Sequence, residues 1–175
     1  MKNRKRHVNI PIFIPHLGCP NACVFCNQRL ISGKKEFSPD TVRSEIETAL
    51  STIPAGVEVE IAFFGGSFTG IDRPLMINLL DVAKEYVDSG RVGSIRLSTR
   101  PDYIDPEILD ILKNYPVGTV ELGIQSMDDR VLAASRRGHT ALQTETACRL
   151  IVGYGFRLVG QMMIGLPGAD EESEV

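Results

Sequence analysis

The sequence predicts an α/β fold of the partial TIM-like (β/α) barrel type, with parallel strands inside and helices outside. Short apolar runs alternate with helical patterns along the 175 residues. The segments between consecutive runs are long enough for a helix, which is the crossover that parallel strands need. A complete barrel of eight units needs about 250 residues, whereas this chain accommodates five. We therefore expect one domain over residues 1–175 with five βα units of six, incomplete at its C-terminal end.

The first half of the chain contains two predicted strands, each followed by a helix. The apolar, β-branched run at residues 8–14 is the first strand. A helix is expected from Ser38, which precedes a first-turn proline and an early acidic residue. The second strand, residues 57–64, leads into a helix over residues 74–87.

The second half repeats this alternation. The predicted elements are strands at residues 94–98, 119–124 and 157–164 and a helix at residues 105–114. Thr140 and Gln143 have the spacing of a capping box, which predicts a further helix ending near Gly153.

The composition excludes some classes of protein. With a net charge of −3, the chain has no overall basic field for nucleic acid. It has no apolar run near the ~20 residues of a membrane span, so we expect no membrane partner and a cytoplasmic location. A basic segment at residues 1–7 and an acidic one at residues 169–175 are interpreted as solvated tails.

Small or polar residues follow each predicted strand. In parallel α/β folds the carboxyl ends of the strands gather at one edge, where ligands bind. After the first strand comes a cysteine-rich loop. The later strand ends carry Gly65, Gly66, Ser67, Ser98, Gln125 and Gln161. The sequence thus predicts one ligand site at this edge.

Three of the four cysteines, Cys19, Cys23 and Cys26, have C-x3-C-x2-C spacing. Soft thiolates select zinc or an iron–sulfur cluster. A structural zinc site needs four ligands, whereas a cluster held by three cysteines keeps one iron open. Two alternatives stay open: Cys148 as a fourth ligand, although it lies on the apolar face of a predicted helix, and His16 or His139 completing a zinc site.

The cysteine motif, with aromatic Phe25 before its last cysteine, resembles the radical S-adenosylmethionine superfamily. The resemblance implies a 4Fe–4S cluster on the three cysteines and S-adenosyl-L-methionine on the open iron. It further implies reductive cleavage to a 5′-deoxyadenosyl radical, with electrons from a flavodoxin- or ferredoxin-type donor. It adds Phe25 to the expected cofactor contacts.

Further motifs resemble one branch of that superfamily. Residues 64–67 are similar to its glycine-rich motif, whose backbone binds the methionyl amino group. Residues 120–126 and 136–139 resemble elongator-type tRNA-modifying enzymes and oxygen-independent coproporphyrinogen dehydrogenases. By that resemblance Gln125 and Arg137, rather than Arg136, contact the cofactor.

Three positions depart from the pattern of the branch. Ser98 stands where relatives often have glutamate, Gln161 where the coproporphyrinogen enzymes have aspartate, and Phe13 where tyrosine is usual. The first two keep hydrogen bonding and lose a negative charge.

These observations leave two hypotheses. The first is a radical enzyme core whose substrate, RNA by analogy, is not specified by the sequence. The second is a non-catalytic module that binds zinc or a cluster.

Overall fold

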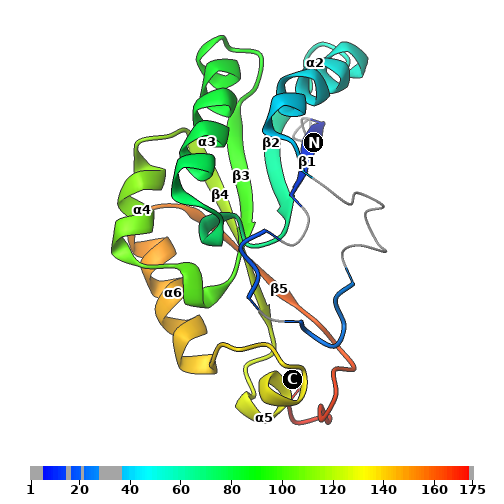
Figure 1. Cartoon of the computed structure of the whole chain (residues 1–175), viewed down its shortest axis with the longest axis vertical. Helices are drawn as coiled ribbons and strands as arrows, with labels where there is room; N and C mark the ends of the chain where they lie inside the picture. The colour runs from blue at the N-terminus through cyan, green and yellow to red at the C-terminus, as the bar shows by residue number, and fades with distance from the viewer. Residues whose placement is uncertain (1–5, 15–16, 21, 28–36, 174–175) are drawn as a thin grey trace, which may run out of the picture.

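The computed structural model describes residues 6–14, 17–20, 22–27 and 37–173. These residues form one sheet of parallel strands in the order β1-β2-β3-β4-β5. The strands are β1 (His7–Ile14), β2 (Glu58–Gly65), β3 (Ser94–Thr99), β4 (Val117–Gln125) and β5 (Arg157–Met162) (Figure 1). Each strand lies beside the next one in sequence, which is the order of a barrel rather than of a doubly wound sheet. The predicted α/β class is confirmed, and an open five-stranded sheet is consistent with a partial barrel.

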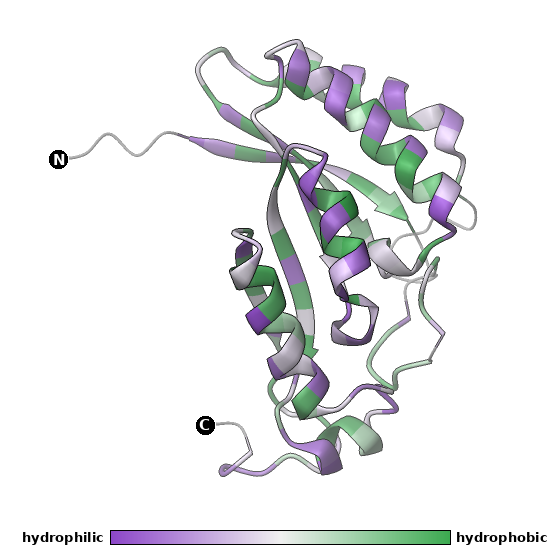
Figure 2. Cartoon of the chain, turned by 90° about the vertical axis from the view of Figure 1, so that its left-hand side faces the viewer, coloured by the Kyte–Doolittle hydropathy of each residue, from purple (hydrophilic) through white to green (hydrophobic). Residues whose placement is uncertain are grey.

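Helices connect the strands and cover one side of the sheet (Figures 1 and 2). They are α2 (Val42–Thr52), α3 (Arg73–Asp88), α4 (Pro106–Lys113), α5 (Asp129–Ala134) and α6 (Ala141–Gly153), with the short 3-10 turns η1 (Pro39–Thr41), η2 (Phe68–Gly70) and η3 (Pro101–Tyr103). Asp72, Asp105 and Thr140 cap α3, α4 and α6 through their side-chain oxygens. Thr140 and Gln143 form the predicted capping box.

Among the helical elements, two details differ from the prediction. Ser38 precedes η1 rather than an α-helix, and its side chain makes no capping hydrogen bond. The helix itself starts at Val42, after the turn that begins with Pro39. The six-residue helix α5 was not predicted, because so short a segment shows no apolar period.

Alternation along the strands gives the sheet two different faces. One face packs under the helices and forms the core, with fully buried Ile61, Phe63 and Leu97 against Leu79 and Leu109. The residues between them point the other way and include charged Glu60, Arg96 and Glu121 beside apolar Ala62 and Phe64. The core therefore lies between sheet and helices, and the opposite, inner face of the partial barrel carries buried charges.

Strand β5 ends at Met162, two residues before the predicted end. Met162 and Ile164 are 55% and 83% exposed, so the sheet has an apolar, uncovered edge there. In the part of the chain that the structure describes, no helix has the length and apolar character to cross a membrane.

Candidate cofactor site at the strand ends

A cavity of about 680 Å³ lies at the carboxyl ends of the strands. This volume is in the usual range of small-molecule sites, about 300–1,000 Å³. Residues from all five strands or from the loops that follow them line it: Phe13, Cys19, Pro20, Ala22, Cys23, Phe25, Cys26, Phe64, Gly65, Gly66, Ser98, Thr99, Arg100, Gly123, Gln125, Arg137 and Gln161. The edge at which the sequence predicted a ligand site is therefore hollowed into one cavity.

The three cysteines of the motif share this cavity. Cys23 is 7% exposed, Cys19 is half-buried and Cys26 is exposed. The backbone N–H of Cys26 donates to the carbonyl of Cys23 at 3.0 Å, and that of Val24 donates to the carbonyl of Ser135 at 3.2 Å. The cysteine loop is thus anchored to the segment that follows α5.

The described residues contain no group of three or more His, Cys, Asp or Glu side chains placed to hold a single metal ion. In a cluster each cysteine binds a different iron, so its ligands are spread more widely than those of one zinc ion. The thiolates of the three cysteines are soft ligands and line one large cavity. This arrangement suits the chemistry of an iron–sulfur cluster.

Glycines let the cysteine loop contact the loop after β2. A Cβ atom at Gly66 would lie 2.0 Å from the carbonyl oxygen of Leu17, and one at Gly18 would lie 2.2 Å from that of Ser67. The N–H of Ser67 donates to the carbonyl of Leu17 at 3.1 Å. The sequence argument explained the glycines after β2 by the close approach of a ligand. In the structure they are also required because the cysteine loop and the loop after β2 approach each other closely.

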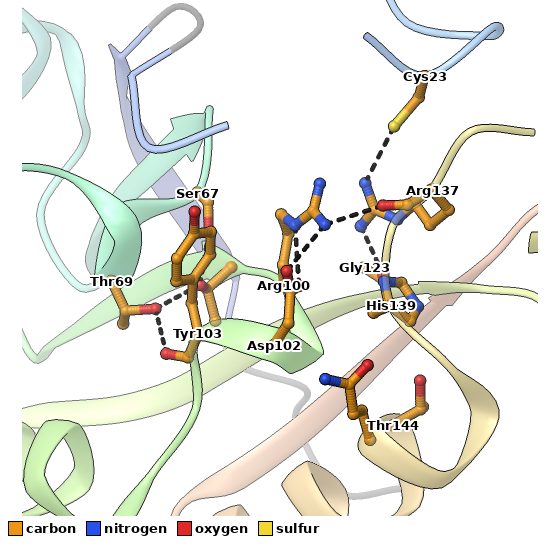
Figure 3. A network of polar contacts seen from close by, with 12 residues as sticks. Cys23, Ser67, Thr69, Arg100, Asp102, Tyr103, Gly123, Arg137, His139 and Thr144 are labelled. Carbon is orange, nitrogen blue, oxygen red and sulfur yellow. Dashed lines mark hydrogen bonds and ion pairs between the residues drawn. The ribbon is translucent and has the colours of Figure 1, made fainter. Parts of the chain in front are cut away.

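Ser67 is the one predicted cofactor residue outside the cavity lining. Its side chain is fully buried, and its Oγ lies 2.9 Å from Oγ1 of Thr99. Thr99 in turn contacts Thr69, which donates to the carbonyl of Tyr103 at 2.8 Å (Figure 3). The Ser67 hydroxyl thus belongs to a network that ties the ends of β2 and β3 together beneath the cavity.

Arg137 enters the cavity from the segment between α5 and α6. It is 7% exposed; its Nη2 donates to the carbonyl of Gly123 at 2.6 Å and its Nη1 to Sγ of Cys23 at 3.7 Å (Figure 3). Arg136 is exposed, with a left-handed φ of 54°. This turn directs the second arginine of the pair, rather than the first, into the cavity.

Gln125 has features typical of a ligand-binding residue. Its φ is 70°, a conformation that costs a non-glycine residue about 1–3 kcal/mol. Its side-chain Oε1 is buried and has no hydrogen-bond partner among the described residues. A donor supplied by a ligand would satisfy this oxygen.

Ser98 and Gln161 line the cavity and are held by a carboxylate that the sequence argument did not single out. Glu121 of β4 accepts from Oγ of Ser98 at 3.2 Å and from Nε2 of Gln161 at 2.9 Å. Glu121 is 7% exposed and forms an ion pair with Arg96, which also pairs with Glu60 at 3.1 Å. The negative charge that serine and glutamine lack is thus present directly behind them, on the inner face of the sheet.

Glu60 stays charged in this buried network. Burial alone would raise the pKa of its carboxyl group, but hydrogen bonds from Ser94 and Arg96 outweigh burial and lower that pKa. His7 adds a contact of 2.8 Å to the same carboxylate.

Arg100 and Asp102, directly after β3, belong to the polar strand-end residues that the sequence predicts, although it assigned them no cofactor contact. The Nε and Nη2 atoms of Arg100 each lie 2.9 Å from an oxygen of Asp102, and Nη2 donates to the carbonyl of Arg137 at 2.8 Å (Figure 3). Arg100 is 2% exposed and lines the cavity.

The remaining candidate metal ligands lie elsewhere. His139 does not line the cavity; its Nε2 is 3.2 Å from the carbonyl of Ile124, and burial, with the positive charge of Arg137, lowers its pKa to about 4. Cys148 packs against the hydrophobic core, and burial raises the pKa of its thiol. His16 lies outside the described residues.

Two relatives illustrate what the sequence is similar to. An uncharacterized methyltransferase of Pyrococcus horikoshii is 28% identical over 89% of this chain and 33% of its own length. A tRNA uridine(34) acetyltransferase of Methanocaldococcus jannaschii is 31% identical over 48% of this chain and 16% of its own length. The chain spans about a third to a half of the length of three curated relatives that it matches.

Solved structures have the same fold. Elp3 of Methanocaldococcus infernus matches with a TM-score of 0.67 at 20% identity, over 97% of this chain and 41% of that one. The radical SAM enzyme coproporphyrinogen III oxidase of Escherichia coli matches with a TM-score of 0.69 at 18% identity, over 97% of this chain and 40% of that one. Residues 13–174, nearly the whole chain, match the sequence pattern of the radical SAM superfamily. The chain belongs to the radical SAM superfamily, a family of enzymes, as its cysteine motif predicted.

Proposed function

We propose that this chain is the cofactor-binding core of a radical enzyme, in which Cys19, Cys23 and Cys26 hold a 4Fe–4S cluster beside S-adenosylmethionine. The observation that carries the proposal is the single cavity lined by the three cysteines and by polar groups from the strand ends. When bound, the reduced cluster supplies one electron to the sulfonium, which gives methionine and a 5′-deoxyadenosyl radical that abstracts hydrogen from a substrate.

Different residues of the cavity bind different parts of the cofactor. The fork of Arg137 suits the methionyl carboxylate, since a guanidinium pairs with a carboxylate through two parallel hydrogen bonds. The buried Oε1 of Gln125 accepts a hydrogen bond from the cofactor. The backbone at Gly65, Gly66 and Ser67 binds the methionyl amino group.

Two further contacts complete the site. Ser98 and Gln161, oriented by the carboxylate behind them, offer hydrogen bonds to the ribose. Phe25 covers the side of the cavity next to the last cysteine and keeps water from it.

Cluster content is the first test. Anaerobic reconstitution should give about four irons and four sulfides per chain. With dithionite and S-adenosylmethionine, the protein should then release 5′-deoxyadenosine. One tightly bound zinc ion and no cluster would instead support a non-catalytic zinc module and sink the proposal.

A matched pair of variants tests the ligand assignment. Cys23→Ala should lose the cluster and the release of 5′-deoxyadenosine. Cys148→Ala, which removes the thiol that lies in the core, should keep both. Undiminished cleavage in Cys23→Ala would contradict the assignment.

We further propose that residues 1–175 act as the core domain of a longer cytoplasmic enzyme that receives electrons from a flavodoxin- or ferredoxin-type donor and modifies RNA. The RNA proposal is supported by the similarity to a tRNA uridine(34) acetyltransferase and by the basic residues 1–7, of which residues 1–5 lie outside the described part. In an electrophoretic mobility-shift assay, total tRNA should bind the loaded protein at low salt. Substitution of the basic residues by alanine should weaken this binding. Absence of any shift would refute an RNA substrate for this chain.

A further inference from the structure

Arg100 is a buried cation. Among the described residues, two nitrogens of its guanidinium have hydrogen-bond partners and the third has none. Arg100 is 2% exposed, and its Nε and Nη2 atoms are held by Asp102 and by the carbonyl of Arg137. These contacts fix the guanidinium from two sides, one within its own loop and one across the site. A charge so deeply buried is retained only where it meets negative charge or acceptors.

The third nitrogen of Arg100 belongs to a side chain that lines the cavity. Nη1 is buried and has no hydrogen-bond partner among the described residues. Figure 3 shows it directed to the same side as the guanidinium of Arg137, toward Cys23. Arg100 lines the cavity and Asp102 does not, so the cation faces the cavity and its counter-ion lies behind it.

Arg100 and the three cysteines line the same cavity. Arg137, whose backbone carbonyl accepts from Arg100, reaches Sγ of Cys23 with its own Nη1 at 3.7 Å. The unpartnered donor of Arg100 therefore lies on the cysteine side of the cavity.

We propose that Arg100 is the cluster-facing cation of the site: its Nη1 donates a hydrogen bond to the cluster or to one of the thiolates that hold it, and its charge favours the reduced cluster. This inference rests on the proposed function, because it requires a cluster on the three cysteines. One-electron reduction adds one negative charge to the cluster. A nearby positive charge and hydrogen bonds to sulfur stabilise that charge and raise the reduction potential.

Asp102 positions Arg100 and offsets part of its charge. Since the carboxylate lies behind the guanidinium, Asp102→Asn should leave Arg100 in place with its full charge and move the reduction potential in the positive direction. Arg100→Met should move it in the negative direction. Opposite shifts from two variants of one ion pair distinguish an electrostatic role from damage to the fold, which would not reverse sign.

The experiment is an EPR-monitored redox titration of the reconstituted protein without S-adenosylmethionine. For Arg100→Met we expect at least a threefold loss in the one-electron equilibrium constant, which is about 28 mV at 59 mV per tenfold change. Asp102→Asn should gain at least threefold. Arg91→Met, which removes an exposed arginine paired with Glu47 on the helical side, serves as the control and should not change the potential.

Each possible result of these measurements either supports or overturns the inference. A change below threefold in Arg100→Met, or shifts of the same sign in both variants, overturns it. So does an unchanged potential combined with weaker binding of S-adenosylmethionine, which would assign Arg100 to the cofactor. If Arg100→Met retains no iron, Asp102→Asn alone tests the inference. A rise in its reduction potential supports the inference, and no rise refutes it. If the unsubstituted protein forms no cluster, it is the proposed function that fails.

Discussion

At the scale of single residues, the polar groups of the cavity depend on a layer of charged side chains below them. Glu121 holds Ser98 and Gln161 and is itself paired with Arg96, which also contacts Glu60. Removing one partner of a buried ion pair leaves the other without compensation, which costs more than the pair contributes. The substitution of single charges in this layer should therefore affect both stability and cofactor binding.

Glu121→Gln keeps a hydrogen-bonding side chain of the same size but removes the charge. We expect a loss of about 1–3 kcal/mol in the free energy of unfolding, because half-buried Arg96 then keeps Glu60 as its one ionic partner among the described residues. We also expect severalfold weaker binding of S-adenosylmethionine, since Gln161 loses its charged acceptor. Urea denaturation and isothermal titration calorimetry measure the two effects.

Glu145→Gln is the matched control for Glu121→Gln. Glu145 pairs with Arg149 on the exposed surface of α6, where such pairs contribute little. An equal loss of stability in both variants would show that burial of the inner network has no special role.

The lowered pKa of His139 predicts how stability depends on pH. His139 is 3% exposed, and its pKa is lowered from 6.5 to about 4 by burial and by Arg137. Between pH 6.5 and 4 the unfolded chain therefore binds a proton that the folded chain does not. The stability linked to His139 is fully present above pH 6.5 and is lost as the pH falls toward 4, by up to about 3 kcal/mol.

His139→Gln isolates this contribution, because glutamine does not titrate. The free energy of unfolding, measured at pH 7 and pH 5, should fall more steeply for the unsubstituted protein than for the variant. Parallel curves for the two proteins would refute the assignment of this pH dependence to His139.

The sequence identified the residues at the strand ends better than those behind them. Ser98 and Gln125 stand out because each is polar and lies at the end of an apolar run, and Gln161 because it is polar within one. Glu121 lies within such a run, and its partner Gln161 is 40 residues away on another strand. The pairing of β4 with β5 brings them together, and the residue pattern within one segment does not specify which strand lies beside it.

At the scale of elements, the cysteine loop and the loop after β2 are fitted to each other through their glycines. The strand ends were predictable from apolar runs and capping signals, because both are local. The mutual fit of Gly18 and Gly66 was not, since it depends on two loops that the parallel pairing of β1 and β2 brings together.

Gly66→Ala should separate the two loops. Its Cβ would lie 2.0 Å from a backbone oxygen of the cysteine loop, which must then move. We expect a reduced iron content after reconstitution with little change in circular dichroism, because the contact lies between two loops and no helix takes part in it.

Gly153→Ala provides the comparison. Gly153 ends α6, and a Cβ there would meet nothing within 4 Å. Alanine should raise the free energy of unfolding by about 0.4–1 kcal/mol and leave the iron content unchanged. Full iron loading of Gly66→Ala would contradict the predicted contact between the loops.

At the scale of the whole molecule, the described chain is a curved sheet with helices on one side, a polar inner face and the cavity at one end. Its strand order leaves β5 at one edge, with a hydrogen-bonding partner on only one side. Met162 and Ile164 add exposed apolar surface at the end of this edge. Unpaired backbone groups beside apolar side chains favour strand pairing with another molecule.

This edge predicts concentration-dependent self-association of the 175-residue chain. A double variant with Met162→Lys and Ile164→Lys should shift the protein toward monomer in sedimentation velocity, because charges on an edge strand oppose pairing. Leu142→Lys is the matched control: Leu142 is 71% exposed and apolar but lies on α6, so its substitution should leave the association unchanged. Equal effects of both changes would indicate general apolar contact rather than pairing at β5. A sedimentation coefficient that does not depend on concentration would show that this edge does not associate.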